Sequence, residues 1–80
     1  MQEDHSAFKI LDEMLPKAFD REVAVAARDA GEPQAGITSL LDFAYIDGFL
    51  THAILDEADR LYPSGDVHDY SRMLRKKLGN

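Results

Sequence analysis

The feature of the sequence that most restricts the fold is a proline-free stretch from Ser39 to Tyr62, in which apolar residues recur at three- and four-residue steps. This spacing places them on one face of an α-helix. The face consists of Phe43, Ile46, Leu50, Ile54, Ala58 and Leu61. Ser39 with Asp42 three residues later resembles a helix-starting capping box, and the Pro-Ser-Gly that follows the stretch ends it. We therefore expect one long helix over 39–62, with Gly48 as a place for a bend or a close helix contact.

Two further segments, near the ends of the chain, have helical spacing of apolar residues. In 6–19 the pattern is interrupted by Pro16, which ends or kinks a helix because proline lacks the backbone donor. Asp4 or Ser6 is suited to cap this first helix. In 66–78 an apolar side is followed by basic residues in the last turns, where the helix dipole favours cations. That apolar side consists of Val67, Tyr70, Met73, Leu74 and Leu78.

The segment 20–31 is more ambiguous. Asp20 is suited to cap a helix and Gly31 to end it in the left-handed conformation. A stripe of small residues suits close helix packing: Val23, Ala26, Ala27 and Ala30. Val23 and Val25 also alternate as in a strand, so that alternative stays open, although the alanines favour helix. The following stretch, 31–36, contains two glycines and a proline and predicts a loop.

Together these patterns predict an all-α fold, a compact bundle of about four helices around the long helix 39–62, in a single domain over 1–80. Eighty residues form a small core with little stability to spare. The chain contains no cysteine, which excludes disulfides and thiolate metal sites. No apolar run approaches the ~20 residues that span a bilayer, and the acidic N-terminus is unlike a signal peptide. We expect a cytoplasmic protein that does not bind membranes.

The charges are distributed unevenly along the chain. Fifteen acidic and nine basic residues give a net charge of −6. All 15 acids but only five of the bases fall within residues 1–70, so that part has a net charge of −10. The other four bases are Arg72, Arg75, Lys76 and Lys77. An acidic body repels nucleic acid and attracts basic protein surfaces.

One acidic stretch has the letters of an ATPase motif. Residues 55–60, LDEADR, resemble the Mg²⁺-holding motif of DEAD-box helicases, and 31–38, GEPQAGIT, resemble a phosphate-binding loop. Ile37 stands where the lysine of that loop must reach the phosphates, so the essential charge is missing. We therefore assign 55–60 to the long helix. His52 and Asp56 are four residues apart and could share a metal, but a surface hydrogen bond between them is the simpler interpretation. We expect no cofactor.

A second row of residues on the long helix points away from its core face. At 100° per residue the row lies on the far side from Phe43 and consists of Leu41, Tyr45, Phe49, His52, Asp56 and Asp59. One explanation is that other helices cover both faces. The alternative is that the aromatic residues bind a second copy or another protein, with Asp56 and Asp59 as a charged rim.

The combined pattern favours a small acidic protein–protein interaction module without enzymatic activity, a binder, inhibitor or regulatory adaptor that acts by surface occlusion. Bacterial and phage inhibitor and immunity proteins share this profile of size, acidity and missing catalytic motifs. A homodimer, or a partner protein with a basic surface, would fit. The main alternative is a nucleic-acid regulator that uses the basic last helix, although binding of nucleic acid is disfavoured by the acidic body.

Two short stretches resemble known families. Residues 36–43, GITSLLDF, resemble the loop of acyl carrier proteins whose serine holds phosphopantetheine, which would make Ser39 that serine. Thr38 stands where that family has aspartate. Residues 45–53, YIDGFLTHA, resemble a short motif of the YecA-like bacterial family, a resemblance that implies no chemistry.

Overall fold

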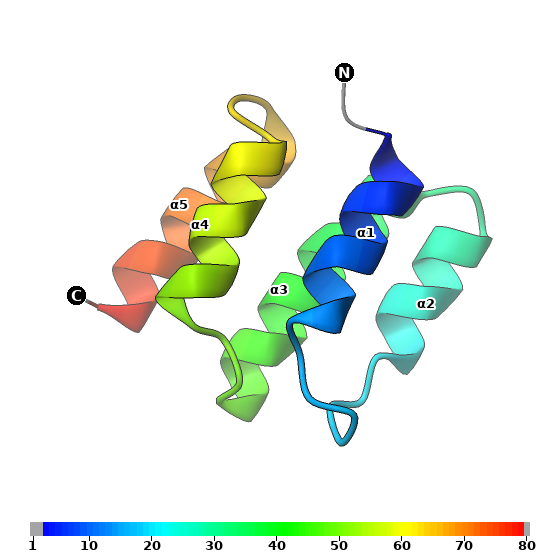
Figure 1. The fold of residues 1–80 in the computed structure, drawn as a ribbon, viewed down its shortest axis with the longest axis horizontal. Coiled ribbons are helices and arrows are strands. Elements are labelled where there is room, and N and C mark those ends of the chain that lie inside the picture. The colour runs from blue at the N-terminus through cyan, green and yellow to red at the C-terminus, as the bar shows by residue number, and fades with distance from the viewer. Residues whose placement is uncertain (1–2, 80) are drawn as a thin grey trace.

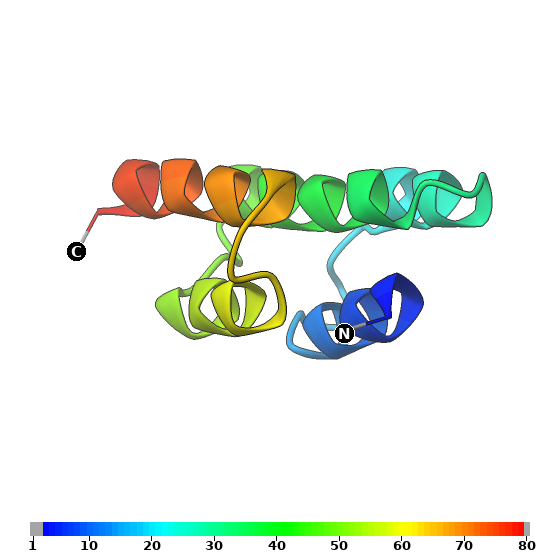
Figure 2. The ribbon, with the colours of Figure 1, turned by 90° about the horizontal axis from the view of Figure 1, so that it is seen from above.

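A computed structural model describes residues 3–79, which form five α-helices. The helices are α1 (Asp4–Glu13), α2 (Glu22–Asp29), α3 (Pro33–Asp47), α4 (His52–Leu61) and α5 (Asp66–Leu78). They pack in two layers, with α2, α3 and α5 side by side in one and α1 and α4 in the other (Figures 1 and 2). The Cα trace measures 33 × 30 × 16 Å, so the molecule is a flat slab. The expected all-α bundle is confirmed, and no strand occurs between residues 3 and 79.

The expected single helix over 39–62 is wrong. The chain leaves α3 at Gly48, whose φ of +83° is a left-handed conformation that glycine adopts without a steric penalty. The amides of Gly48 and Phe49 donate to the carbonyls of Tyr45 and Ala44, which is the Schellman pattern of a helix end. Thr51 then starts α4, and its hydroxyl accepts a hydrogen bond from the Ile54 amide at 3.2 Å.

The start of α3 also differs from the sequence-based expectation. The helix begins at Pro33 rather than Ser39, so most of the predicted loop 31–36 is helical. Proline suits the first helical position because the amide it lacks would have no helical partner there. Ser39 is half-buried in the middle of α3 and caps nothing.

The other helices match the expectations more closely. Residues Glu22–Asp29 form a helix, α2, so the strand alternative for this segment is wrong. Gly31 follows it with φ +87°, and the amides of Gly31 and Glu32 close a Schellman motif on Arg28 and Ala27. The first helix ends before Pro16, as predicted, but Glu3 caps it instead of Asp4 or Ser6. The last helix has the predicted bounds.

The core lies between the two layers and draws on every helix. Its largest fully buried apolar side chains are Phe8, Leu11, Ile37, Leu40, Leu41, Leu55, Val67 and Leu74. Three residues expected in the core are instead exposed, namely Ile46 (63%), Val23 (56%) and Met73 (39%). In the small-residue stripe of α2, Val23, Ala26 and Ala30 are exposed and Ala27 is half-buried, whereas Ala24 is the residue of α2 that is buried. None of the described helices has the length and apolar character needed to cross a membrane.

Candidate protein-binding surfaces

The structure divides the six residues predicted to bind a partner between two helices and the turn that joins them. Leu41 is 1% exposed and belongs to the core, so it does not present a surface to a partner. Tyr45 is half-buried against the core. Phe49 lies in the turn with 38% of its surface exposed. Because the chain breaks at Gly48, the six residues do not form one continuous helical row.

The other three predicted residues, His52, Asp56 and Asp59, lie on α4. His52 is exposed in the first turn. The Arg75 guanidinium joins α5 to the carboxylates of Asp56 and Asp59, at 3.0 and 2.9 Å. The second oxygen of Asp59 is buried without a hydrogen-bond partner, 3.5 Å from the Nδ1 of His68. These acids therefore link α4 to α5. Because Arg75 is paired with them, its charge is neutralised within the basic cluster that a nucleic-acid regulator would use.

A different surface forms where the α1–α2 loop meets the α3–α4 turn, at the lower end of the molecule in Figure 1. The rings of Phe19 and Phe49 pack edge to face with centroids 6.1 Å apart. Phe19 is buried, whereas Phe49 and Met14 remain 38% and 40% exposed. We call this surface the loop end, and define it by Glu13, Met14, Phe19, Asp47 and Phe49.

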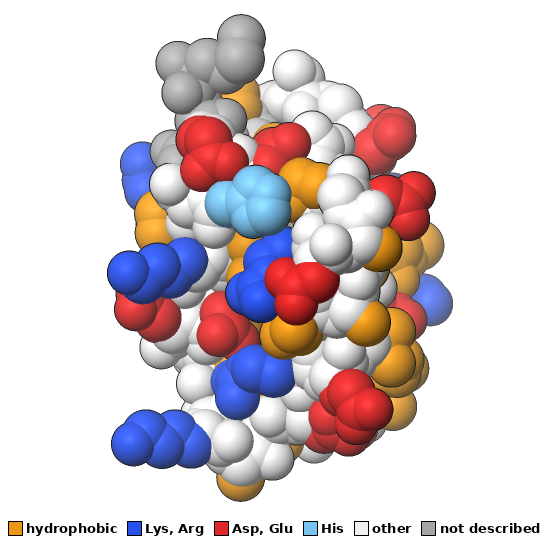
Figure 3. Space-filling model, turned by 90° about the vertical axis from the view of Figure 1, so that its right-hand side faces the viewer, with side chains coloured by type: hydrophobic (Ala, Val, Ile, Leu, Met, Phe, Trp, Pro, Cys, Tyr) orange, Lys and Arg blue, Asp and Glu red, His pale blue; other side chains and the backbone are white. Residues whose placement is uncertain are grey.

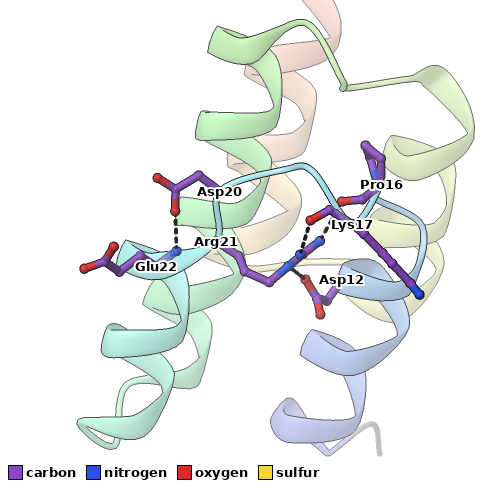
Figure 4. Close-up of polar contacts among 6 residues, drawn as sticks. All are labelled: Asp12, Pro16, Lys17, Asp20, Arg21 and Glu22. Carbon is purple, nitrogen blue, oxygen red and sulfur yellow. Dashed lines mark hydrogen bonds and ion pairs between the residues drawn. The ribbon is translucent and has the colours of Figure 1, made fainter.

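Arg21 holds the α1–α2 loop in place below this surface (Figure 4). Its guanidinium donates to Asp12 Oδ1 at 2.5 Å and to the carbonyls of Pro16 and Lys17 at 3.1 and 3.5 Å. It also lies over the Phe19 ring, 5.5 Å from the centroid. Both carbonyls belong to the loop that follows α1, and the Pro16 carbonyl also accepts a hydrogen bond from the Phe19 amide at 3.0 Å.

The electrostatics of the loop end are unusual for helix termini. α1 ends in Asp12 and Glu13, α3 ends in Asp47, and neither helix has a basic residue in its last turn. A helix C-terminus has a partial negative charge, so acids there cost stability. Asp12 is neutralised by Arg21, whereas Glu13 and Asp47 are exposed and form no ion pair with any residue in 3–79. The loop end therefore has exposed apolar side chains together with two carboxylates, those of Glu13 and Asp47, that form no ion pair within residues 3–79.

Other candidate sites have less support. An open hollow of about 1010 Å³ lies at the opposite end of the slab, between the starts of α1 and α3 and the end of α4. Within it the Tyr62 hydroxyl donates to Asp4 Oδ1 at 2.5 Å. Among residues 3–79 no three His, Cys, Asp or Glu side chains are grouped to hold a metal. Ser39, inside α3, is not in the loop position that the acyl-carrier resemblance requires.

The sequence contained a partial signal for the loop end. Phe49 was among the residues predicted to bind a partner, whereas Met14, Phe19 and Arg21 were not. The two acids at the end of the first helix were visible in the sequence, but their position at the same end of the molecule as the end of α3 depends on how α1 packs on α3.

The fold and these surfaces define a small five-helix protein with exposed apolar side chains at one end. No protein-family model, curated protein or solved structure matches the chain.

Proposed function

We propose that this protein is a non-enzymatic protein-binding module that uses the loop end to cover a basic surface of a partner, as an inhibitor or adaptor does. The observation that supports this most directly is the pairing of exposed Met14 and Phe49 with the acids that end α1 and α3. An apolar centre with a charged rim is the composition of protein-binding patches.

The position of the acids argues for a role beyond folding. Glu13 and Asp47 lie where the helix dipoles oppose them, at a cost of about 0.3–1 kcal/mol each. Local choices that oppose stability are expected at functional sites. A basic partner is attracted by two sources of negative charge here, because the carboxylates and the C-termini of the two helices contribute fields of the same sign. Such attraction raises the association rate and weakens in salt.

The proposal is tested by reversing the two charges in Glu13→Lys/Asp47→Lys. The partner is first captured from a lysate of the source organism with the wild-type protein and identified by mass spectrometry, and the Kd is then measured by calorimetry. The double variant is expected to bind about tenfold more weakly or worse, since close interfacial charge pairs couple by about 1.5 kcal/mol or more. Its thermal stability should rise, because lysine suits a helix C-terminus.

A control is Asp29→Lys, which reverses one charge in the last turn of α2, at the opposite end of the slab, and also breaks the ion pair of Asp29 with Arg28. This variant is expected to keep the wild-type Kd within about twofold, well below the tenfold effect of a lost charge pair. Equal binding by the wild type and the double variant would refute the loop end as the binding surface. Catalytic turnover of the captured partner would refute the non-enzymatic role.

A further inference from the structure

The connection between α3 and α4 interrupts a sequence pattern that is otherwise helical. We call its four residues, 48–51, the hinge. Apolar residues keep their helical spacing through the hinge, and they are Phe43, Ile46, Leu50, Ile54, Ala58 and Leu61. In one continuous helix, at ~100° per residue, the buried side chains of α3 and those of α4 would fall within about 50° of each other. A helical hinge would therefore leave both buried faces on the same side of a single helix.

The hinge joins two units of the fold. α3 and α4 hardly contact each other, although they are consecutive in the chain. α4 packs on α5, and Arg75 of α5 binds the carboxylates of Asp56 and Asp59 of α4. α1 and α2 pack on α3, with α2 at the edge of the molecule, where acidic and basic side chains are interspersed (Figure 3). The two units are therefore residues 4–47 and the α4–α5 hairpin, 52–78.

The contacts between these units do not require that both belong to one chain. The hairpin packs on α3 through α5 and on α1 through α4. Its Tyr62 hydroxyl donates to Asp4 Oδ1 at 2.5 Å, and its buried side chains complete the core. The hairpin of a second copy can make all of these contacts, provided that the hinge does not fold back. Such an exchange changes the structure only at the hinge.

We propose that the hinge opens, so that α3 and α4 continue as one helix over 33–61 and two copies of the chain exchange their α4–α5 hairpins. The product is a two-fold symmetric dimer in which each core is built from both chains. The partner is a second copy because the core that the hairpin leaves is complementary to that same hairpin. This exchange does not depend on the proposed function.

The residues at the hinge suit the exchanged dimer. Because the turn has only four residues, the end of α3 from one copy and the start of α4 from the other lie close together in each core. The two hinges therefore run antiparallel, side by side, about the two-fold axis. Phe49, which is 38% exposed in the single chain, then comes near Phe49 of the second copy. Asp47 comes near the second copy's His52 and not near its own equivalent, so like charges are not brought together.

The exchange is measured by sedimentation velocity after the chain is refolded from urea at high micromolar concentration. The wild type is expected to contain a dimer fraction beside the single chain of 9.0 kDa. Gly48→Ala should lower the dimer dissociation constant by about tenfold or more, because alanine is strained in the left-handed turn, suits a helix, and occurs in two hinges per dimer. Far-UV circular dichroism confirms that each variant is folded.

A matched control is Gly31→Ala in the turn between α2 and α3. Gly31 is also left-handed, with φ +87° against +83° at Gly48, and a Cβ at either position would meet no atom within 4 Å. Pro33 prevents α2 and α3 from merging, since the residue before a proline is disfavoured in a helix. Gly31→Ala should therefore carry a similar backbone strain and leave the dimer fraction unchanged.

His52→Pro is the variant that holds the hinge closed. His52 is the first residue of α4, a position that suits proline, and the preceding Thr51 has the extended backbone that proline requires, with φ −124° and ψ 161°. Inside a continuous helix the same proline would clash with the preceding turn and remove a hydrogen bond. His52→Pro should keep the single chain folded and abolish the dimer, also in combination with Gly48→Ala.

The opening of the hinge is measured by electron spin resonance on a chain with two spin labels, at Gln34→Cys and Arg60→Cys. The native chain has no cysteine, so only these positions are labelled. In the single chain both positions border the same hollow, so the labels lie close together. In one continuous helix they would be 26 residues apart, about 39 Å. Refolding with excess unlabelled chain ensures that only the distance within one chain is recorded. The dimer fraction should give the long distance.

Several outcomes would overturn the inference. Absence of a dimer in both the wild type and Gly48→Ala would show that the hinge does not open. A dimer that keeps the short distance between the labels would show association without exchange. A dimer that persists in His52→Pro would contradict the continuous helix. Equal dimer formation by Gly31→Ala and Gly48→Ala would attribute the effect to general destabilisation.

Discussion

Gly36 sets how closely α2 and α3 approach each other. It is buried in the first turn of α3, and a Cβ at this position would lie 2.9 Å from the Ala24 carbonyl oxygen and 3.2 Å from the Phe8 ring. The nearer atom belongs to the backbone, which does not move aside as a flexible side chain does. The contact between the two helices therefore depends on the absence of a side chain.

We predict that Gly36→Ala destabilises the fold by about 1–3 kcal/mol, the usual cost of overpacking. Urea unfolding measures the change. Ala35→Leu is the control, since the neighbouring Ala35 is exposed and tolerates added bulk. An unchanged midpoint for Gly36→Ala would mean that the helices separate without penalty.

Tyr62 joins the end of α4 to the start of α1 through Asp4. Burial, followed by the hydrogen bond to the Asp4 carboxylate, raises the pKa of the Tyr62 phenol. The raised pKa means that the folded state favours the neutral phenol. The corresponding stability is complete below the unfolded value of 10.0 and is lost as the pH rises above it.

We predict that Tyr62→Phe lowers stability at pH 7 by about 1 kcal/mol through the lost hydrogen bond. The variant should also lose less stability than the wild type when the pH is raised above 10. Thermal unfolding at a series of pH values measures both effects, with Tyr45→Phe as the control. Identical alkaline losses in the wild type and Tyr62→Phe would contradict the assignment.

At the scale of elements, the turn at Gly48 separates what would otherwise be one helix. Leu50 returns to the core only three residues after α3 ends, and its amide donates to the Ala44 carbonyl at 3.1 Å. The apolar pattern therefore continues through a segment that is not helical.

We predict that Gly48→Ala costs about 1–2 kcal/mol, because a Cβ is strained in the left-handed conformation although no other atom lies within 4 Å. Gly48→Asn should cost less, since asparagine tolerates this conformation better. Chemical unfolding with far-UV circular dichroism provides the measurement. A gain of helicity without loss of stability in Gly48→Ala would indicate that α3 and α4 merge readily.

The sequence-based predictions were correct where a strong local signal marked the start or end of a helix. α5 was located with its correct bounds because glycines flank it and an amphipathic pattern fills it. The end of α2 at Gly31 and the break before Pro16 were also predicted from local signals. Burial was predicted less well, since Ile46 and Met73 have core-like spacing but are exposed. Their exposure depends on which neighbours the helices acquire.

The sequence by itself determined that the chain is helical, where most helices stop, and that its body is acidic, because these properties depend on spacing, backbone conformation and composition. The tertiary structure alone decided that 39–62 is two helices, that Leu41 is buried, and that Met14 and Phe49 lie beside acids from different helices. Those outcomes depend on contacts between residues distant in the chain. An apolar residue is suited equally to a core and to an interface, and only packing distinguishes the two.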